Sequence, residues 1–205
     1  AGGQAPFAAV VGCIDSRVAN RTASCKRRRE DDFTAGGINC RRPDRAVIAY
    51  ANLIRQYFKG TVPLVLGGIE ASLRRIAHYD AWDNRVRRSI LFDAKADYLL
   101  YGMADRSVVQ LAQALAAGQS PLSIRGLCYA AAAPPEGALM LPTYQTTAAN
   151  KKAFISMFRT FYDNNDPVTA QALVQQQDSR FLVHNPPQPP LSTAELDAIH
   201  SLEFE

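Results

Sequence analysis

Short, nearly continuous apolar runs alternate with helical stripes along the first two thirds of the chain. Four of these runs, at 6–14, 62–66, 96–101 and 124–129, have the length and composition that are typical of buried strands. Helical spacing of apolar residues is found between these runs, at 43–58, 70–77 and 108–115. This alternation predicts a three-layer α/β fold around a parallel sheet, with right-handed crossovers.

The last third of the chain has a different pattern. Residues 131–142 are rich in Ala and Pro, and we interpret them as a linker between a first domain (1–130) and a small, mostly helical appendage (143–205). The appendage is predicted to contain a helix around Phe154–Tyr162, a second from Asp166 to about Gln177, a strand at Arg180–His184, and a final helix capped at Ser192–Glu195. Since the chain lacks an initiator Met and soon enters a strand-like run, we expect it to be a segment of a longer protein.

Polar residues and glycines gather where the predicted strands end. Asp15 and Ser16 follow the first strand, Gly67 and Gly68 the second, and Gly102 the third. Ligands of open α/β sheets bind outside the carboxyl ends of the strands, so this edge is the expected binding edge. Glycines there let backbone N–H groups approach a ligand, although many strand–helix turns carry glycine merely to turn. Both interpretations of the glycine pair stay open.

Five arginines bracket the polar hexapeptide HYDAWD at 78–83: Arg74, Arg75, Arg85, Arg87 and Arg88. The guanidinium fork suits a carboxylate or a phosphate, so the segment is a candidate anion site. The acidic residues of the hexapeptide suit an internal ion-pair network equally well, and the pattern favours that structural role. His78 is a candidate general base, but a lone histidine is more often a hydrogen-bonded structural residue.

The most basic segment lies between Arg17 and Arg45 and contains the run Lys26–Arg29. The acidic run Glu30–Asp32 follows directly and cancels much of its field. The chain of 205 residues carries a net charge of only +4, which does not require a nucleic-acid partner. A non-catalytic module that contacts RNA or an acidic partner through Arg17–Arg45 is the alternative to an enzyme domain.

The four cysteines, at 13, 25, 40 and 128, are widely spaced, and no pair forms C-x-x-C. We expect free thiols in a reducing compartment, which favours the cytoplasm; a metal site from the first three is the less favoured alternative. No apolar run approaches the ~20 residues of a membrane span, so no membrane contact is expected. Without a G-x-S-x-G, an H-E-x-x-H or a nucleophile–base pair, no catalytic residue and no metal ligand is assigned.

Several segments resemble, in the family's order, the N-terminal region of YgiQ-type radical SAM proteins. They are GCIDS (12–16), KRRREDDFTAGG (26–37), RPDRA (42–46), GGIEASLRRIAHYDAWDNRVRRSILFDAKAD (67–97) and NPPQPPLSTAELD (185–197). The string GGIEASLRRIAHYD is long and specific, and the resemblance covers nearly the whole chain.

The resemblance implies a Rossmann-like, cobalamin-domain-like N-terminal domain, with the protein's own radical SAM barrel as its partner. In the family's barrel, a C-x-x-x-C-x-x-C motif holds a 4Fe–4S cluster that cleaves S-adenosylmethionine to a 5′-deoxyadenosyl radical. This chain contains no such motif, so the cluster and S-adenosylmethionine are implied only for the full-length protein. The D-x-H-x-x-G string of cobalamin carriers is also absent, which argues against cobalamin.

We therefore expect the domain to cap the barrel mouth and to face a substrate of unknown identity. The residues expected to face the substrate or the barrel are Asp15, Ser16, Gly67, Gly68, Glu70, Ser72, Arg74, Arg75, His78, Tyr79 and Asp80. In this hypothesis the glycine pair allows backbone approach. Arg74 and Arg75 contact an anion, and polar orientation comes from His78 and Asp80.

Overall fold

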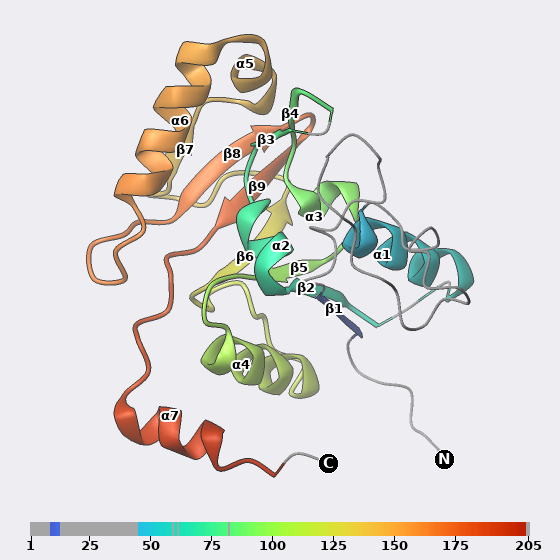
Figure 1. The fold of residues 1–205 in the computed structure, drawn as a ribbon, viewed down its shortest axis with the longest axis vertical. Coiled ribbons are helices and arrows are strands. Elements are labelled where there is room, and N and C mark those ends of the chain that lie inside the picture. Colours follow the sequence, from blue (N-terminus) through green and yellow to red (C-terminus); the bar gives the residue numbers. More distant parts are fainter. Residues whose placement is uncertain (1–8, 13–44, 59, 61, 82, 204–205) are drawn as a thin grey trace, which may run out of the picture.

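The structure is a computed structural model that describes residues 9–12, 45–58, 60, 62–81 and 83–203 (Figure 1). In this part of the chain a seven-stranded mixed sheet has the strand order β1-β2-β5-β6-β9-β8-β7. Its strands are β1 (Ala9–Gly12), β2 (Leu64–Gly67), β5 (Tyr98–Leu100), β6 (Leu127–Ala131), β7 (Leu139–Leu141), β8 (Leu173–Gln177) and β9 (Arg180–His184). A separate antiparallel pair joins β3 (His78–Asp80) to β4 (Arg85–Arg87).

The first half of the sheet is parallel and has helices between its strands. β1 pairs with β2 and β2 with β5, both in parallel. The crossovers contain α1 (Ala46–Tyr57) before β2, and α2 (Gly68–Leu73) and α3 (Ile90–Asp93) before β5. The predicted α/β fold with a Rossmann-like parallel arrangement is confirmed.

The second half of the sheet differs from the parallel arrangement that the sequence predicts. After β5, α4 (Asp105–Ala116) and residues 117–126 bring the chain back to the carboxyl end of β5, where Leu127 pairs with Leu100. β6 therefore runs antiparallel to β5, and β9 antiparallel to β6. Because two successive reversals restore the direction, β9 runs the same way as β2 and β5, and its carboxyl end lies at the same edge.

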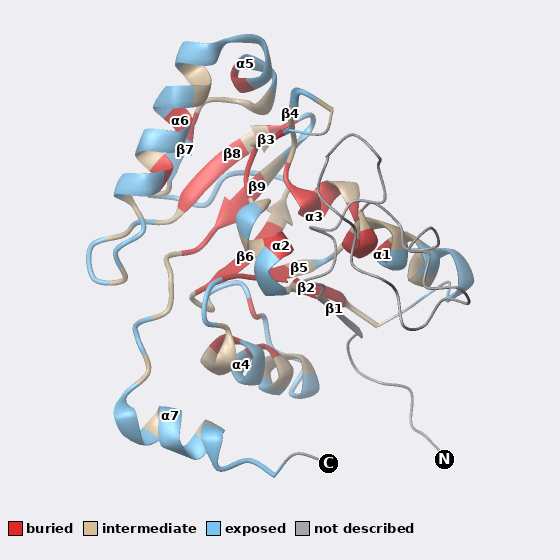
Figure 2. Cartoon of the chain, in the orientation of Figure 1, coloured by how far each residue is buried: buried red, intermediate tan, exposed pale blue. Residues whose placement is uncertain are grey.

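Two apolar layers hold the helices against the sheet. Adjacent strand residues point to opposite faces, as with Leu64 and Val65 in β2. The face of Leu64 packs against α1, α2, α3 and α6 (Lys151–Asp163), and the face of Val65 packs against α4 through Leu111. Figure 2 shows the buried residues concentrated along the central strands. The sheet is thus covered on both sides, as the three-layer prediction requires.

The C-terminal third contributes strands as well as helices. The predicted strand at Arg180–His184 is confirmed as β9, and the predicted helix around Phe154–Tyr162 as α6. The capping box at Ser192 opens α7 (Thr193–His200) as expected, and α5 (Tyr144–Ala149) precedes α6. The prediction of a helix from Asp166 to about Gln177 is wrong, because Leu173–Gln177 forms β8.

Pairing with a neighbouring strand explains the change from helix to strand at Leu173–Gln177. β8 forms a hairpin with β9, and Asp178 adopts a φ of +58° in the tight turn between them. The sheet also continues through residues 131–142, which supply β7. The division into a domain, a linker and an appendage stays a prediction, and the described parts of all three share one sheet.

Candidate functional site at the carboxyl edge of the sheet

Two of the predicted site residues, Asp15 and Ser16, lie outside the described residues. Gly67 ends β2 and Gly68 begins α2 with a φ of +82°, a conformation that favours glycine. A Cβ atom on Gly67 would meet no atom of the described residues within 4 Å. The structure therefore shows a turning role for Gly68, and backbone approach of a ligand at Gly67 stays a prediction.

Ser72 ties the ends of two parallel strands together. Its hydroxyl donates to the carbonyl oxygen of Gly68 (2.9 Å) and accepts from the backbone N–H of Gly102 (3.2 Å). Gly102 lies just beyond the end of β5, so this side chain joins the turn after β2 to the turn after β5. Ser72 therefore links the carboxyl ends of β2 and β5.

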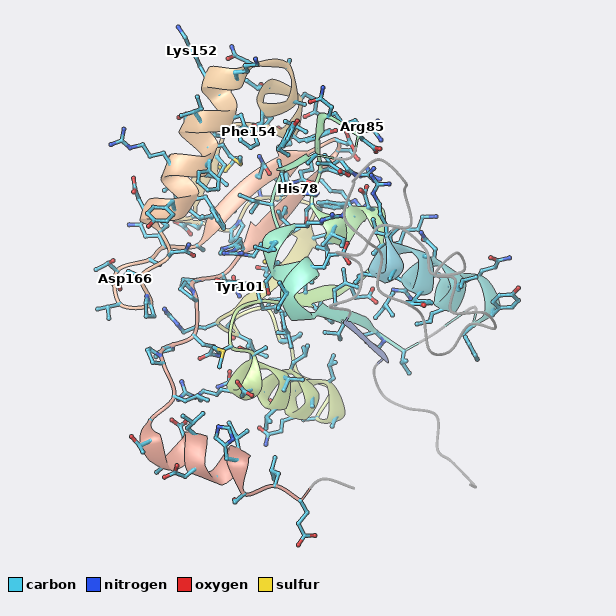
Figure 3. All side chains as sticks on the ribbon, viewed as in Figure 1. His78, Arg85, Tyr101, Lys152, Phe154 and Asp166 are labelled. Carbon is cyan, nitrogen blue, oxygen red and sulfur yellow. The ribbon has the colours of Figure 1, made fainter. Side chains whose placement is uncertain are left out.

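Arg75 is the centre of a cluster at the same edge, which we call the Arg75 cluster: Arg75, Tyr101, Phe161, Asn165 and His184. The Arg75 guanidinium packs against two aromatic rings, with Cζ 4.5 Å from the ring centroids of Tyr101 and Phe161. Arg75 Nε donates to Nε2 of His184 (2.9 Å), and the His184 ring stacks on Tyr101 with centroids 4.4 Å apart. Figure 3 labels Tyr101, at the end of β5.

The outer edge of the guanidinium contacts Ser72 and Asn165. One terminal nitrogen, Nη1, donates to the carbonyl oxygen of Ser72, and the other, Nη2, reaches Oδ1 of Asn165 at 3.4 Å. Asn165 is exposed in the loop that follows α6, so solvent reaches this end of Arg75. Within the described part of the chain, no Asp or Glu oxygen forms an ion pair with Arg75. Burial lowers the pKa of Arg75 because it removes hydration from the charged form.

The other titratable groups around Arg75 are held neutral. Burial, reinforced by the charge of Arg75, lowers the pKa of His184 to about 3. Since Nε2 of the neutral ring accepts from Arg75, the proton lies on Nδ1, which is buried without a hydrogen-bond partner among the described residues. Burial also raises the pKa of Tyr101, whose hydroxyl donates to the carbonyl oxygen of Asn185 (2.6 Å). Arg75 is thus the charged member of the cluster.

Glu70 and Arg74 lie on α2 but make a different contact. Their side chains form an ion pair of 3.1 Å, with Glu70 only 4% exposed. Neither Glu70 oxygen has a hydrogen-bond partner among the described residues. The structure therefore separates the two arginines that the sequence placed together: Arg74 lies beside a carboxylate, and Arg75 among aromatic rings.

His78, Tyr79 and Asp80 lie on β3, and none of them has a hydrogen bond to Arg75 among the described residues. Asp80 is buried and accepts from Arg45 (2.6 Å), while Tyr79 is exposed and donates to Asn84 (2.6 Å). Nδ1 of His78 donates to the carbonyl oxygen of Ile76 (3.1 Å), and burial is the main reason that the pKa of His78 falls to about 4. At neutral pH His78 is therefore an uncharged, largely buried side chain.

The remaining arginines of the bracketed segment form an ion-pair network. Arg87 contacts Asp83 (3.3 Å) and Asp93 (2.6 Å). Arg88 joins Asp93 (2.7 Å) to Asp178 in the β8–β9 turn (3.0 Å). These pairs connect the β3–β4 hairpin to α3 and to the sheet, which is the structural role that the sequence favoured. Arg45 belongs to the same network; residues 17–44 of the basic segment lie outside the described residues.

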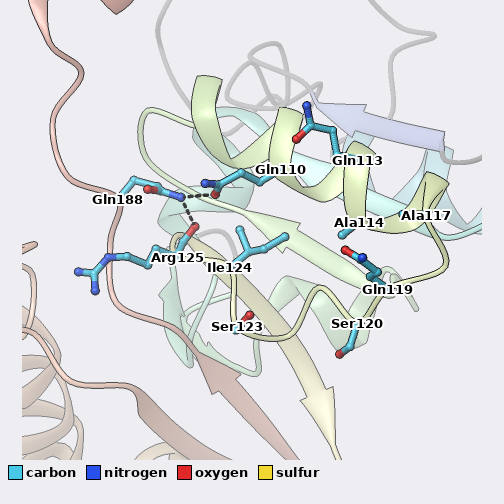
Figure 4. Close-up of a pocket in the computed structure, with 10 residues that line it drawn as sticks. All are labelled: Gln110, Gln113, Ala114, Ala117, Gln119, Ser120, Ser123, Ile124, Arg125 and Gln188. Atoms are coloured by element: carbon cyan, nitrogen blue, oxygen red, sulfur yellow. Dashed lines mark hydrogen bonds between the residues drawn. The ribbon is translucent and has the colours of Figure 1, made fainter.

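Surface hollows lie beside several of these elements, among them one of about 210 Å³ lined by Arg85, Arg87, Arg88, Asp93, Tyr144 and Asp178. A largely apolar one of about 280 Å³ is lined by Leu73, Ile76, Ala77, His78, Tyr79, Phe154, Phe158 and Phe161. A larger polar one of about 510 Å³ lies beside α4 (Figure 4), where Gln188 donates to Gln110 (2.9 Å) and to the carbonyl oxygen of Arg125 (3.1 Å). Arg125 itself donates to the carbonyl oxygens of Pro167 and Pro187.

The sequence interpretation missed Tyr101, Phe161, Asn165 and His184. His184 ends a strand that was predicted, so the rule that ligands bind at carboxyl strand ends would have selected it if the direction of β9 had been known. Phe161 was assigned to a helical apolar stripe, which is correct, but a stripe does not say which ring meets a cation. The contacts of this cluster span residues 75–184, and no local pattern encodes them.

The described residues do not provide a site for an iron–sulfur cluster or another metal. Of the four cysteines, Cys128 alone is described, and burial raises the pKa of its thiol to about 12. Within the part described, no group of three or more His, Cys, Asp or Glu side chains is placed to hold a metal ion. Cluster ligation needs thiolates, so these residues do not fit that cofactor. No helix among the described residues is both long and apolar enough to span a membrane.

Comparison with known proteins finds one matching family model and several similar curated proteins. A family model described as "Radical SAM N-terminal" matches residues 4–205. A UPF0313 protein from Fusobacterium nucleatum is 52% identical over 97% of this chain and 35% of its own length. A UPF0313 protein from Thermotoga maritima is 47% identical over 97% of this chain and 35% of its length, and one from Clostridium botulinum is 43% identical over 94% and 31%.

The chain spans about a third of the length of these curated relatives. No solved structure matches it.

Proposed function

We propose, from the premise that the chain belongs to the Radical SAM N-terminal family, that it is the substrate-facing accessory domain of a radical SAM enzyme. The relatives are about three times as long as this chain, which leaves ample length for a catalytic barrel in such an enzyme. The 4Fe–4S cluster and S-adenosylmethionine would be held there, because the described residues do not fit a cluster. The domain would then cap the barrel mouth with the carboxyl edge of its sheet.

The observation that carries the proposal is the charge of Arg75 at that edge, which has no carboxylate partner among the described residues. Most arginines of the predicted segment meet carboxylates within 4.0 Å, as Arg74, Arg87 and Arg88 do. Arg75 meets aromatic rings, an imidazole and an amide instead. A buried charge without a counter-ion is costly to folding, and such costs persist where a ligand uses the group. This edge is also where open α/β sheets bind ligands.

The first test is to read the open reading frame beyond Glu205. A C-x-x-x-C-x-x-C motif downstream would be followed by anaerobic reconstitution and by measurement of 5′-deoxyadenosine after reduction. We expect a 4Fe–4S absorbance and reductant-dependent 5′-deoxyadenosine. A stop codon, or a reconstituted protein that never cleaves S-adenosylmethionine, would overturn the proposal.

The second test asks whether this edge faces the substrate. Arg75→Ala is compared with Arg159→Ala, a control on the exposed side of α6. We expect Arg75→Ala to reduce the stimulation of 5′-deoxyadenosine formation by a small-molecule cell extract, while cleavage without extract and the control are unchanged. If Arg75→Ala lowers only the melting temperature, Arg75 is structural and the proposed orientation of the domain is wrong.

A further inference from the structure

We infer that the Arg75 cluster is a binding site for a carboxylate or phosphate group of a small-molecule ligand. The assignment of that ligand as the substrate of a radical enzyme rests on the proposed function above, whereas the anion site itself rests on the geometry of Arg75. The site has one cation from the segment after α2, two aromatic rings from the end of β5 and from α6, and an exposed amide from the loop after α6.

The guanidinium has hydrogen-bonding capacity that the described residues leave unused. Arginine has five N–H donors. Arg75 directs three of them to His184, to the carbonyl oxygen of Ser72 and to Asn165, the last over a long 3.4 Å contact. The two other N–H groups have no acceptor among the described residues. An anion arriving from the solvent side would receive these two and would readily displace the long contact to Asn165.

The surroundings of Arg75 favour one negative charge and supply none. His184 and Tyr101 are neutral because burial disfavours their charged forms, and Phe161 is apolar. Two aromatic rings pack against the guanidinium and shield it from water, so an ion pair formed at its edge is screened less than one on an open surface. These contacts also restrict the Arg75 side chain, which lowers the entropy lost when an anion binds.

The shape of the donor set identifies the ligand class. A fixed guanidinium fork matches two oxygens of a carboxylate or a phosphate, and halide ions gain little from it. Nδ2 of Asn165 has no acceptor among the described residues, so it can donate to a further oxygen of a phosphate. The site therefore recognises an oxyanion that presents two of its oxygens to the fork.

Anion binding is measured on the full-length protein by calorimetric titration with inorganic phosphate and, separately, with acetate. Ionic strength is held constant with sodium chloride. We expect Arg75→Gln to weaken binding about tenfold or more, the loss expected for charge-assisted hydrogen bonds, with Arg159→Gln unchanged. Phosphate represents a phosphate group of the ligand and acetate a carboxylate group. The anion that binds more tightly identifies the group that the site recognises.

Asn165→Asp tests the same inference without removing the arginine. The new carboxylate lies beside Nη2 of Arg75 and supplies the missing counter-ion from within the chain. We expect it to raise the melting temperature and to abolish binding of both anions, while Gln171→Glu, which adds the same charge in the same loop, does neither. Anion binding that persists in Arg75→Gln and in Asn165→Asp would overturn the inference.

The two hypotheses fail separately. A protein that binds phosphate through Arg75 but never yields 5′-deoxyadenosine retains the anion site and loses the proposed function. A protein that yields 5′-deoxyadenosine but shows no Arg75-dependent binding of either anion retains the proposed function and loses the anion site.

Discussion

Acid should destabilise this protein through its buried neutral histidines, and His184 allows the effect to be isolated. Its side chain is 2% exposed, and burial lowers its pKa from the ordinary 6.5 to about 3. Between these values the unfolded chain binds a proton that the folded chain does not. The free energy of unfolding is therefore unaffected above about 6.5 and falls as the pH drops towards about 3.

The size of the effect follows from the pKa values. At about pH 5, His184 should reduce the free energy of unfolding by about 2 kcal/mol relative to neutral pH. His78, whose pKa is lowered to about 4, should contribute a similar amount. These are order-of-magnitude figures, and they predict a slope with pH that is independent of the absolute stability.

Urea denaturation at neutral pH and at about pH 5 measures this slope. His184→Gln keeps an acceptor for Arg75 but cannot be protonated, so it should lose about 2 kcal/mol less than the unmodified protein over this range. His200→Gln, at an exposed position in the last turn of α7, is the control. If His184→Gln shows the unmodified slope, His184 is protonated in the folded state and its neutral role beside Arg75 is refuted.

Two further substitutions test the backbone and the sheet. Gly68→Ala should lower the free energy of unfolding by about 1–2 kcal/mol, because the φ of +82° is strained for any L-residue. Gly67→Ala should lower it clearly less, because Gly67 has a φ of −154° and no described atom near the position of a Cβ. Chemical denaturation of both variants measures the difference. Leu182→Ala removes a fully buried side chain from β9 and should lower the free energy of unfolding by about 2–5 kcal/mol. Because β9 shares its sheet with β2 and β5, calorimetry should show this loss in one transition, and a separate unaffected transition would contradict a single cooperative unit.

The sequence predicted the positions of some site residues correctly and of others incorrectly. Ser72 and Arg75 were predicted from a local string, and both lie at the expected edge because α2 directly follows the end of β2. Asp80 was predicted for the same edge, but β3 carries it into an ion pair with Arg45. The local pattern thus predicted the turn after β2 correctly. It could not predict the position of residues beyond that turn, because the β3–β4 hairpin changes the direction of the chain.

The alternation of apolar runs and helical stripes by itself determined the α/β class, the parallel strands β1, β2 and β5, and the capped helix α7, because these follow from local spacing and short connections. Only the tertiary structure decided that Leu173–Gln177 is a strand, since its pairing with β9 outweighs its helical pattern. It also decided that Arg74 meets Glu70 while Arg75 meets Tyr101, Phe161 and His184. Neighbouring residues of one sequence motif differ there because long-range packing, which no local pattern encodes, sets the partners of each side chain.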